Sequence, residues 1–87
     1  MSTKKRLRRK RIHLYLLDDN TNSFEYVINV LVHVCNMNAL QAEQCALLTH
    51  STGKSHIYTS LNGVEALVTY ETLLKSGLNI QLNTKKL

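Results

Sequence analysis

The spacing of apolar residues changes repeatedly along this 87-residue chain, and the order of the changes constrains the fold more than any other feature. A two-residue alternation over residues 12–16 predicts a strand, and helical spacing follows over residues 24–35 and 39–49. A second strand is predicted over Ser55–Thr59, followed by a third helix and a strictly alternating strand over Leu78–Asn83. The order β-α-α-β-α-β predicts an α+β two-layer sandwich, in which three helices cover one face of a three-stranded antiparallel sheet.

Short polar residues predict where the helices begin and end. Asn22 or Ser23 can cap the first helix, Asn38 the second and Asn62 the third, because their side chains accept hydrogen bonds from free backbone N–H groups. Gly77 suits the left-handed residue that ends the third helix. These signals agree with the apolar spacing and strengthen the predicted element order.

The apolar faces of these elements predict one small core, as expected for a single domain of this length. On the second strand, His56 and Tyr58 are expected on one side of the sheet and Ile57 on the other. Cys35 and Cys45 lie on apolar helix faces and are expected to be buried free thiols. The predicted core residues are Val27, Ile28, Leu31, Cys45, Leu48, Leu67, Val68, Ile80 and Leu82.

The charge is distributed unevenly. Seven of the eleven Lys and Arg residues lie within residues 4–11 and all six acids follow, so the rest of the chain carries four cations and six acids, a net charge of −2. We expect a disordered basic arm over residues 1–11, a domain over 12–84 and a short tail over 85–87. Such an arm can contact nucleic acid, anionic lipid or an acidic partner, or act as a solubilising tail. Its charge does not distinguish among these roles.

Several classes of protein are disfavoured by what the sequence lacks. No apolar run reaches the ~20 residues of a transmembrane helix, and the basic start lacks the apolar stretch of a signal peptide. We therefore expect a cytoplasmic protein. The sequence has no phosphate-binding loop, dinucleotide fingerprint or nucleophile elbow, and its Cys and His residues lack zinc-ligand spacing. No metal, cofactor or enzymatic activity is predicted.

A polar cluster of Asp18, Asp19, Asn20 and Asn22 separates the first strand from the first helix. These residues can simply cap the helix, where the acids interact favourably with the positive N-terminal end of the helix dipole. They can also form a small binding site together with His50, in front of an apolar pocket between the first and second helices. The residue types alone leave both interpretations open.

Two segments resemble the signature of a known family. Leu16–Val27 resembles the pattern Leu-x-Asn-Asp-Asp…Met/Phe-Glu/Asp-x-Val of ClpS, the bacterial adaptor of the ATP-dependent Clp protease. Ala42–His50, followed by Gly53-Lys54, resembles the family's second helix and following turn. The likeness runs from about Ile12 to Leu82, which is nearly the whole predicted domain.

The resemblance implies a function without catalysis or a cofactor. ClpS proteins bind substrates whose first residue is large and hydrophobic, the N-degrons of the bacterial N-end rule, and deliver them to a Clp-type AAA+ ATPase for proteolysis. Such an adaptor is expected to be a monomer that binds neither membranes nor nucleic acid. The family fold also resembles the C-terminal domain of the ribosomal stalk protein. The alternative is therefore a nucleic-acid- or ribosome-interacting module that uses the basic arm.

The resemblance also implies roles for individual residues. Asp18 stands at the position of the family's pocket asparagine, Asp19 matches its aspartate and His50 its histidine, the three positions that hold the substrate α-amino group and first peptide unit. Ala46 replaces a frequent methionine, which predicts a wider pocket that tolerates Ile or Val better. Thr59–Ala66 keeps only the Thr of the family's ATPase-facing pattern, so a remodelled partner surface is expected. The residues expected to form the hydrophobic pocket are Asn22, Phe24, Val27, Val30, Ala46 and Thr49.

Overall fold

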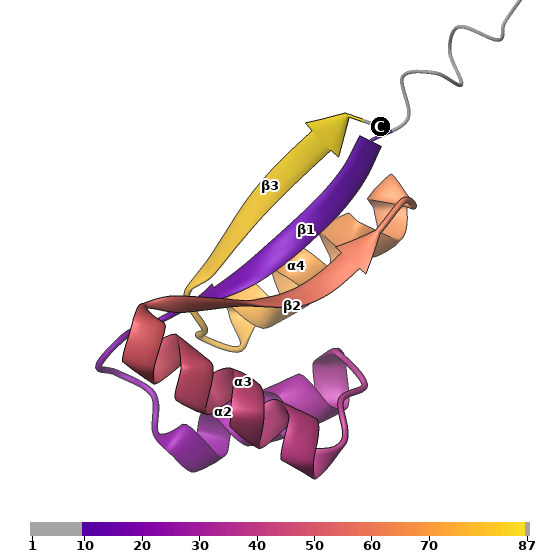
Figure 1. Ribbon diagram of the computed structural model, residues 1–87. Coiled ribbons are helices and arrows are strands. Elements are labelled where there is room, and N and C mark those ends of the chain that lie inside the picture. Colours follow the sequence, from indigo (N-terminus) through magenta and orange to yellow (C-terminus); the bar gives the residue numbers. More distant parts are fainter. Residues whose placement is uncertain (1–9, 87) are drawn as a thin grey trace, which may run out of the picture.

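The computed structural model describes residues 10–86, which fold into three helices and three strands in the predicted order (Figure 1). The elements are β1 (Lys10–Leu17), α2 (Phe24–Val34), α3 (Ala39–Thr52), β2 (Lys54–Ser60), α4 (Gly63–Lys75) and β3 (Ile80–Lys86). The first nine residues of the predicted basic arm lie outside the described residues.

The three strands form one antiparallel sheet in the order β2-β1-β3, so the first strand of the chain is central. Leu14 is paired with Tyr58 on β2 and with Leu82 on β3. In Figure 1, α4 lies behind the strands, and α2 and α3 lie together beyond one end of the sheet. The predicted α+β sandwich is confirmed.

The predicted caps begin all three helices. Ser23 Oγ accepts the Tyr26 N–H at 3.1 Å, and Asn38 Oδ1 accepts the Gln41 N–H at 2.7 Å. Asn62 Oδ1 accepts two N–H groups at the start of α4, at 3.0 and 3.1 Å. Since each bond satisfies a donor that has no partner within the helix, these residues fix the starts of the helices.

The element ends differ from the predictions by two or three residues. Helix α3 continues three residues beyond the predicted end, to Thr52, and stops where Gly53 adopts a left-handed conformation with φ of +99°. Strand β1 begins two residues earlier than predicted, and β3 begins at Ile80 and runs to Lys86. Leu78 belongs instead to the turn after α4, where its N–H donates to the Leu73 carbonyl.

A β-bulge corrects the predicted orientation of side chains on β2. The register shifts between Leu14 and Tyr15, so Tyr58 pairs with Leu14 and His56 with Tyr15. Ile57 is the additional residue, and it is buried while Tyr58 packs partly against the core. The expectation that His56 and Tyr58 share one side was therefore wrong, because strict alternation does not hold across a bulge.

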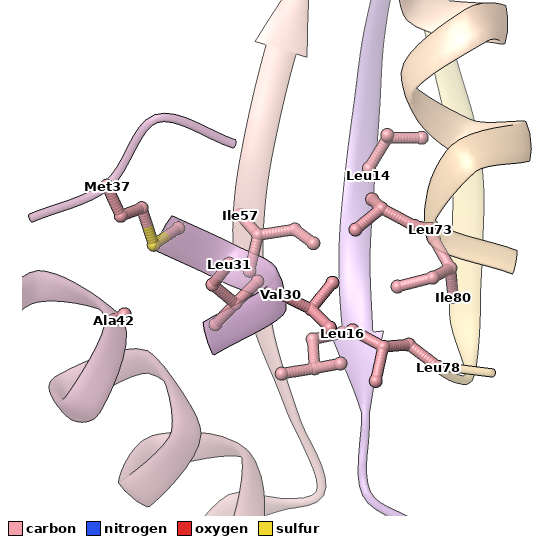
Figure 2. Packing of buried hydrophobic residues seen from close by; sticks show 10 residues of the cluster. All are labelled: Leu14, Leu16, Val30, Leu31, Met37, Ala42, Ile57, Leu73, Leu78 and Ile80. Atoms are coloured by element: carbon pink, nitrogen blue, oxygen red, sulfur yellow. The ribbon is translucent and has the colours of Figure 1, made fainter. Parts of the chain in front are cut away.

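The core lies between the sheet and the helices (Figure 2). Leu31 and Ile80 are buried as predicted, and Val27, Ile28, Cys45 and Leu82 are half-buried at its edge. The buried apolar cluster consists of Leu14, Leu16, Val30, Leu31, Met37, Ala42, Ile57, Leu73, Leu78 and Ile80.

Three predicted core residues are on the surface. Leu48, Leu67 and Val68 are 49%, 50% and 58% exposed. On α4, Ala66 and Leu73 are buried two turns apart, and Tyr70 between them packs partly against the core. With these residues facing inward, Leu67 and Val68 lie on the exposed side of the helix. The helical spacing did not show which side faces the core, because leucine and valine occur on both sides of this segment.

The two cysteines are free and half-buried rather than fully buried. Burial raises the pKa of the Cys35 thiol to about 11 and also raises that of Cys45. Since the thiolate is the reactive form, both side chains act as small apolar groups at neutral pH.

Candidate functional site

A pocket of about 310 Å³ opens where the end of β1 meets the start of α2 and the second half of α3. It contains eight of the nine predicted site residues, together with Leu16, Leu17 and Asn20. The residues that line it are Leu16, Leu17, Asp18, Asp19, Asn20, Asn22, Phe24, Val27, Ala46, Thr49 and His50.

Val30 does not belong to the pocket. It is 8% exposed and points toward β1 between Leu31 and Leu16 (Figure 2). Val27 and Val30 are one turn apart on α2, and only Val27 reaches the pocket wall. The position predicted for Val30 was therefore wrong, because the helix turns this side chain into the core.

Asp19 organises the polar rim. Its Oδ1 accepts the N–H groups of Thr21 and Asn22 at 2.9 and 3.1 Å, and its Oδ2 accepts the Asn22 side-chain amide at 3.3 Å. The same amide donates to the Gly77 carbonyl at 2.9 Å, which ties the rim to the turn before β3. Three of the roughly four acceptor sites of the carboxylate are thus already occupied.

These hydrogen bonds change the acidity of Asp19. Partial burial alone raises the pKa, but the donors from Asn22 and Thr21 outweigh it and hold the pKa below the ordinary value of 3.8. A carboxyl group with a lowered folded-state pKa stabilises the fold above its ordinary pKa. This stabilisation is lost as the pH falls through the lowered value.

Replacing Asp19 with asparagine is therefore expected to destabilise the domain by about 1 kcal/mol near neutral pH, and by progressively less as the pH falls below 3.8 and through the lowered pKa of Asp19. Urea unfolding at a series of pH values measures this difference. Glu43→Gln, which removes a carboxylate from the exposed surface of α3, is the control. A difference that stays constant down to the lowest pH would contradict the structural role of the Asp19 charge.

Asp18 and His50 face each other across the mouth of the pocket. Asp18 Oδ1 lies 3.8 Å from His50 Nδ1, and the two side chains are 39% and 81% exposed. The Asp18 backbone N–H donates to the Gly53 carbonyl at 3.0 Å, which fixes the end of β1 beside the end of α3. Asp18 lines the pocket, and no hydrogen bond among the described residues uses its carboxylate, so the acceptor capacity of its oxygens is available to a ligand.

Two small, buried side chains form the inner wall of the pocket. Ala46 is 5% exposed and Thr49 4%. Thr49 Oγ1 donates to the Cys45 carbonyl at 2.8 Å and lies 2.6 Å from Ser55 Oγ, so this hydroxyl is bound to the protein. With its hydroxyl satisfied in this way, Thr49 can present an apolar methyl group to a ligand.

Two lining residues were not predicted, although the sequence contains a signal for them. Leu16 and Leu17 are consecutive leucines at the end of β1, directly before the acids. Neighbouring residues on a strand point to opposite faces, so their joint presence at the pocket means that the strand end itself forms part of the wall.

Within residues 10–86, no group of three or more His, Cys, Asp or Glu side chains is placed to hold a metal ion. In the same part of the chain, none of the helices combines the length and apolar character needed to cross a membrane.

Comparisons with known proteins identify the family. The family model described as ATP-dependent Clp protease adaptor protein ClpS matches residues 8–76. The structure of Agrobacterium tumefaciens ClpS2 bound to L-phenylalaninamide is similar with a TM-score of 0.67 and 20% identity, over 90% of this chain and 98% of that chain. None of the curated proteins matches. On the family match, which spans most of the chain, this protein belongs to the ClpS family of Clp protease adaptors.

Proposed function

We propose that this adaptor binds the first residue of N-degron substrates in the pocket at the end of β1 and delivers them to a Clp-type AAA+ ATPase, without catalysing a reaction itself. The supporting observation is a pocket of about 310 Å³ that combines an apolar interior with a carboxylate rim. This volume lies at the lower end of the ~300–1,000 Å³ typical of ligand pockets, which suits one side chain and one amine.

The rim suits a protonated α-amino group. Such an amine has three N–H donors and needs oxygen or imidazole acceptors. Within residues 10–86 the Asp18 carboxylate accepts no hydrogen bond and has only the exposed His50 beside it, at 3.8 Å, whereas most of the Asp19 acceptor sites hold the turn. We therefore assign the main direct contact to Asp18, a positioning role with one remaining acceptor site to Asp19, and an additional contact to the exposed His50.

The interior suits a large hydrophobic side chain. Val27, Ala46 and Leu16 contribute apolar walls, and Phe24, which is 42% exposed, adds an aromatic side chain to the lining. Two or three charge-assisted hydrogen bonds and one buried leucine give a gross interaction of ~8 kcal/mol, which corresponds to a Kd of about 1 μM before the entropy of association is subtracted, so the affinity is expected to be micromolar or weaker. An adaptor that must release its cargo works in this range.

The related ClpS2 structure supports the proposal through the chemistry of its ligand. L-phenylalaninamide has a free α-amino group, an aromatic side chain and an amide in place of a carboxylate, and so resembles the first residue of a polypeptide. Titration of otherwise identical peptides that begin with leucine, with free and with acetylated N-termini, tests the function directly. We expect saturable binding of the free peptide and none of the acetylated one. Equal binding of both would overturn the proposal.

The small side chain of Ala46 is expected to broaden the choice of first residue. A pocket with alanine leaves room for the extra branch of Ile or Val near the peptide backbone, and discrimination by one methylene is worth only about 1–3 kcal/mol. We expect peptides beginning with Leu and Ile to differ in affinity by less than about a hundredfold. Ala46→Met should selectively weaken the Ile peptide. A larger Leu preference in the unmodified protein would contradict this prediction.

A further inference from the structure

The face of the sheet that points away from the helices is not covered by any element within residues 10–86. In Figure 1, α4 lies behind the strands, and no helix crosses in front of β1 and β3. On β1, Leu14 and Leu16 are buried against the helices, so the alternate residues Arg11, His13 and Tyr15 lie on the uncovered side. We call this side the outer sheet face.

The outer sheet face is cationic. Arg11 on β1 is paired with Lys85 on β3, and Lys54 lies on β2 opposite Leu17. None of the six acids lies on a strand. Like charges directly opposite each other destabilise a sheet, so an anion bound between Arg11 and Lys85 would remove an existing repulsion. Five further Lys and Arg residues precede β1 in the sequence, within residues 4–9.

Three rings cluster beside these cations. Tyr15 and His13 each lie against His56, with ring centroids 5.3 and 5.2 Å apart. Lys54 Nζ stands 5.1 Å from the Tyr15 ring centroid. The bulge brings Thr59 into the cluster, since its Oγ1 lies 2.6 Å from His56 Nε2 and 3.0 Å from His13 Nδ1. Burial and the nearby His13 lower the pKa of His56, which favours a neutral ring at physiological pH.

We propose that the outer sheet face binds single-stranded nucleic acid. Phosphates would lie on Arg11, Lys54 and Lys85, and bases would stack on Tyr15 and His56. Cations that follow a phosphate chain beside exposed rings are the combination by which proteins hold single strands without reading their sequence. The site is separate from the pocket, since none of these five residues lines it.

Other anionic partners fit this face less well. A lipid surface would reward exposed large apolar side chains. Within the described chain, these all lie on helices or in the loop before α4, and none lies on a strand. An acidic protein would satisfy the cations but would give the ring cluster no specific role. A single strand uses both the cations and the rings, because its phosphates are negative and each of its bases has a flat aromatic face that can stack.

The test is fluorescence anisotropy of a labelled single-stranded RNA of mixed sequence, titrated with the full chain at several salt concentrations. Lys85→Gln should weaken binding and reduce the slope of log K against log salt by about 0.7, the value for one lost phosphate contact on a single strand. Lys75→Gln, at the end of α4, is the matched control and should leave the slope unchanged. Tyr15→Leu should weaken binding about tenfold, whereas Tyr15→Phe should retain it.

The variants must still bind the leucine peptide as the unmodified chain does, which controls for folding and separates this proposal from the pocket's function. The proposal is overturned if RNA binding is unchanged by both Lys85→Gln and Tyr15→Leu, since residues 1–9 would then account for it. It is also overturned if anionic vesicles bind more tightly than RNA and Tyr15→Leu has no effect. If the unmodified chain binds RNA as expected but does not bind the leucine peptide, the result counts against the proposed function of the pocket and not against this proposal.

Discussion

Asp18→Ala is expected to weaken binding of a peptide with a free N-terminal leucine by about ten- to a hundredfold, because a hydrogen bond to a charged group contributes about 1.5–3 kcal/mol. Asp18 is chosen because its carboxylate has no hydrogen-bond donor among the described residues, so its removal breaks no internal contact of that kind. Isothermal titration calorimetry measures the affinity directly.

The matched control for Asp18→Ala is Glu43→Ala, which removes one negative charge from α3 outside the pocket lining. It should bind the leucine peptide as the unmodified chain does. Both variants should melt within a few degrees of each other, since surface substitutions of this kind usually change stability by less than about 0.5 kcal/mol. An Asp18→Ala protein with full affinity would show that the amine is held elsewhere on the rim.

Leu73→Ala is expected to cost about 3–5 kcal/mol of unfolding free energy. Leu73 is fully buried, on the side of α4 that faces the sheet. Domains of this size are stabilised by only about 5–15 kcal/mol, so the loss is a large part of the total. Urea unfolding followed by circular dichroism measures it.

Leu67→Ala is the control for Leu73→Ala, because it removes the same atoms from the same helix at a position that is 50% exposed. It should cost less than about 1 kcal/mol. If Leu73→Ala does not fold, Leu73→Met is expected to remain folded and to lose less than about 1.5 kcal/mol. Equal losses at positions 73 and 67 would contradict the orientation of α4.

Features that depend on residues close together in the chain could be predicted from the sequence, and features that depend on packing could not. The caps at Ser23, Asn38 and Asn62 were predictable because each bond joins residues two or three positions apart. Most of the pocket residues were expected, partly from the polar cluster and the helical spacing and partly from the likeness to ClpS, whereas Leu16 and Leu17 were missed and Val30 was wrongly included. The inward side of α4 was not predictable, since Leu67, Val68 and Leu73 are all apolar and only packing against the sheet selects Leu73.

The bulge on β2 shows the same limit in a strand. The residues His56–Thr59 read as an ordinary alternation, and no glycine or proline marks the extra residue. The register with β1, more than 40 positions earlier in the chain, is what makes Ile57 the unpaired residue. The ring cluster on the outer sheet face follows from that register and therefore could not be found from β2 alone.

The central position of β1 has a consequence for how the chain folds. Leu14 must be joined by Tyr58 on one side and by Leu82 on the other, so neither neighbour is a nearby hairpin partner. Pairings between such distant residues slow folding, because a long loop must close before the contact stabilises it. During synthesis, one edge of β1 stays open until the last strand has been made. In that interval the open edge of β1 is available to pair with another chain.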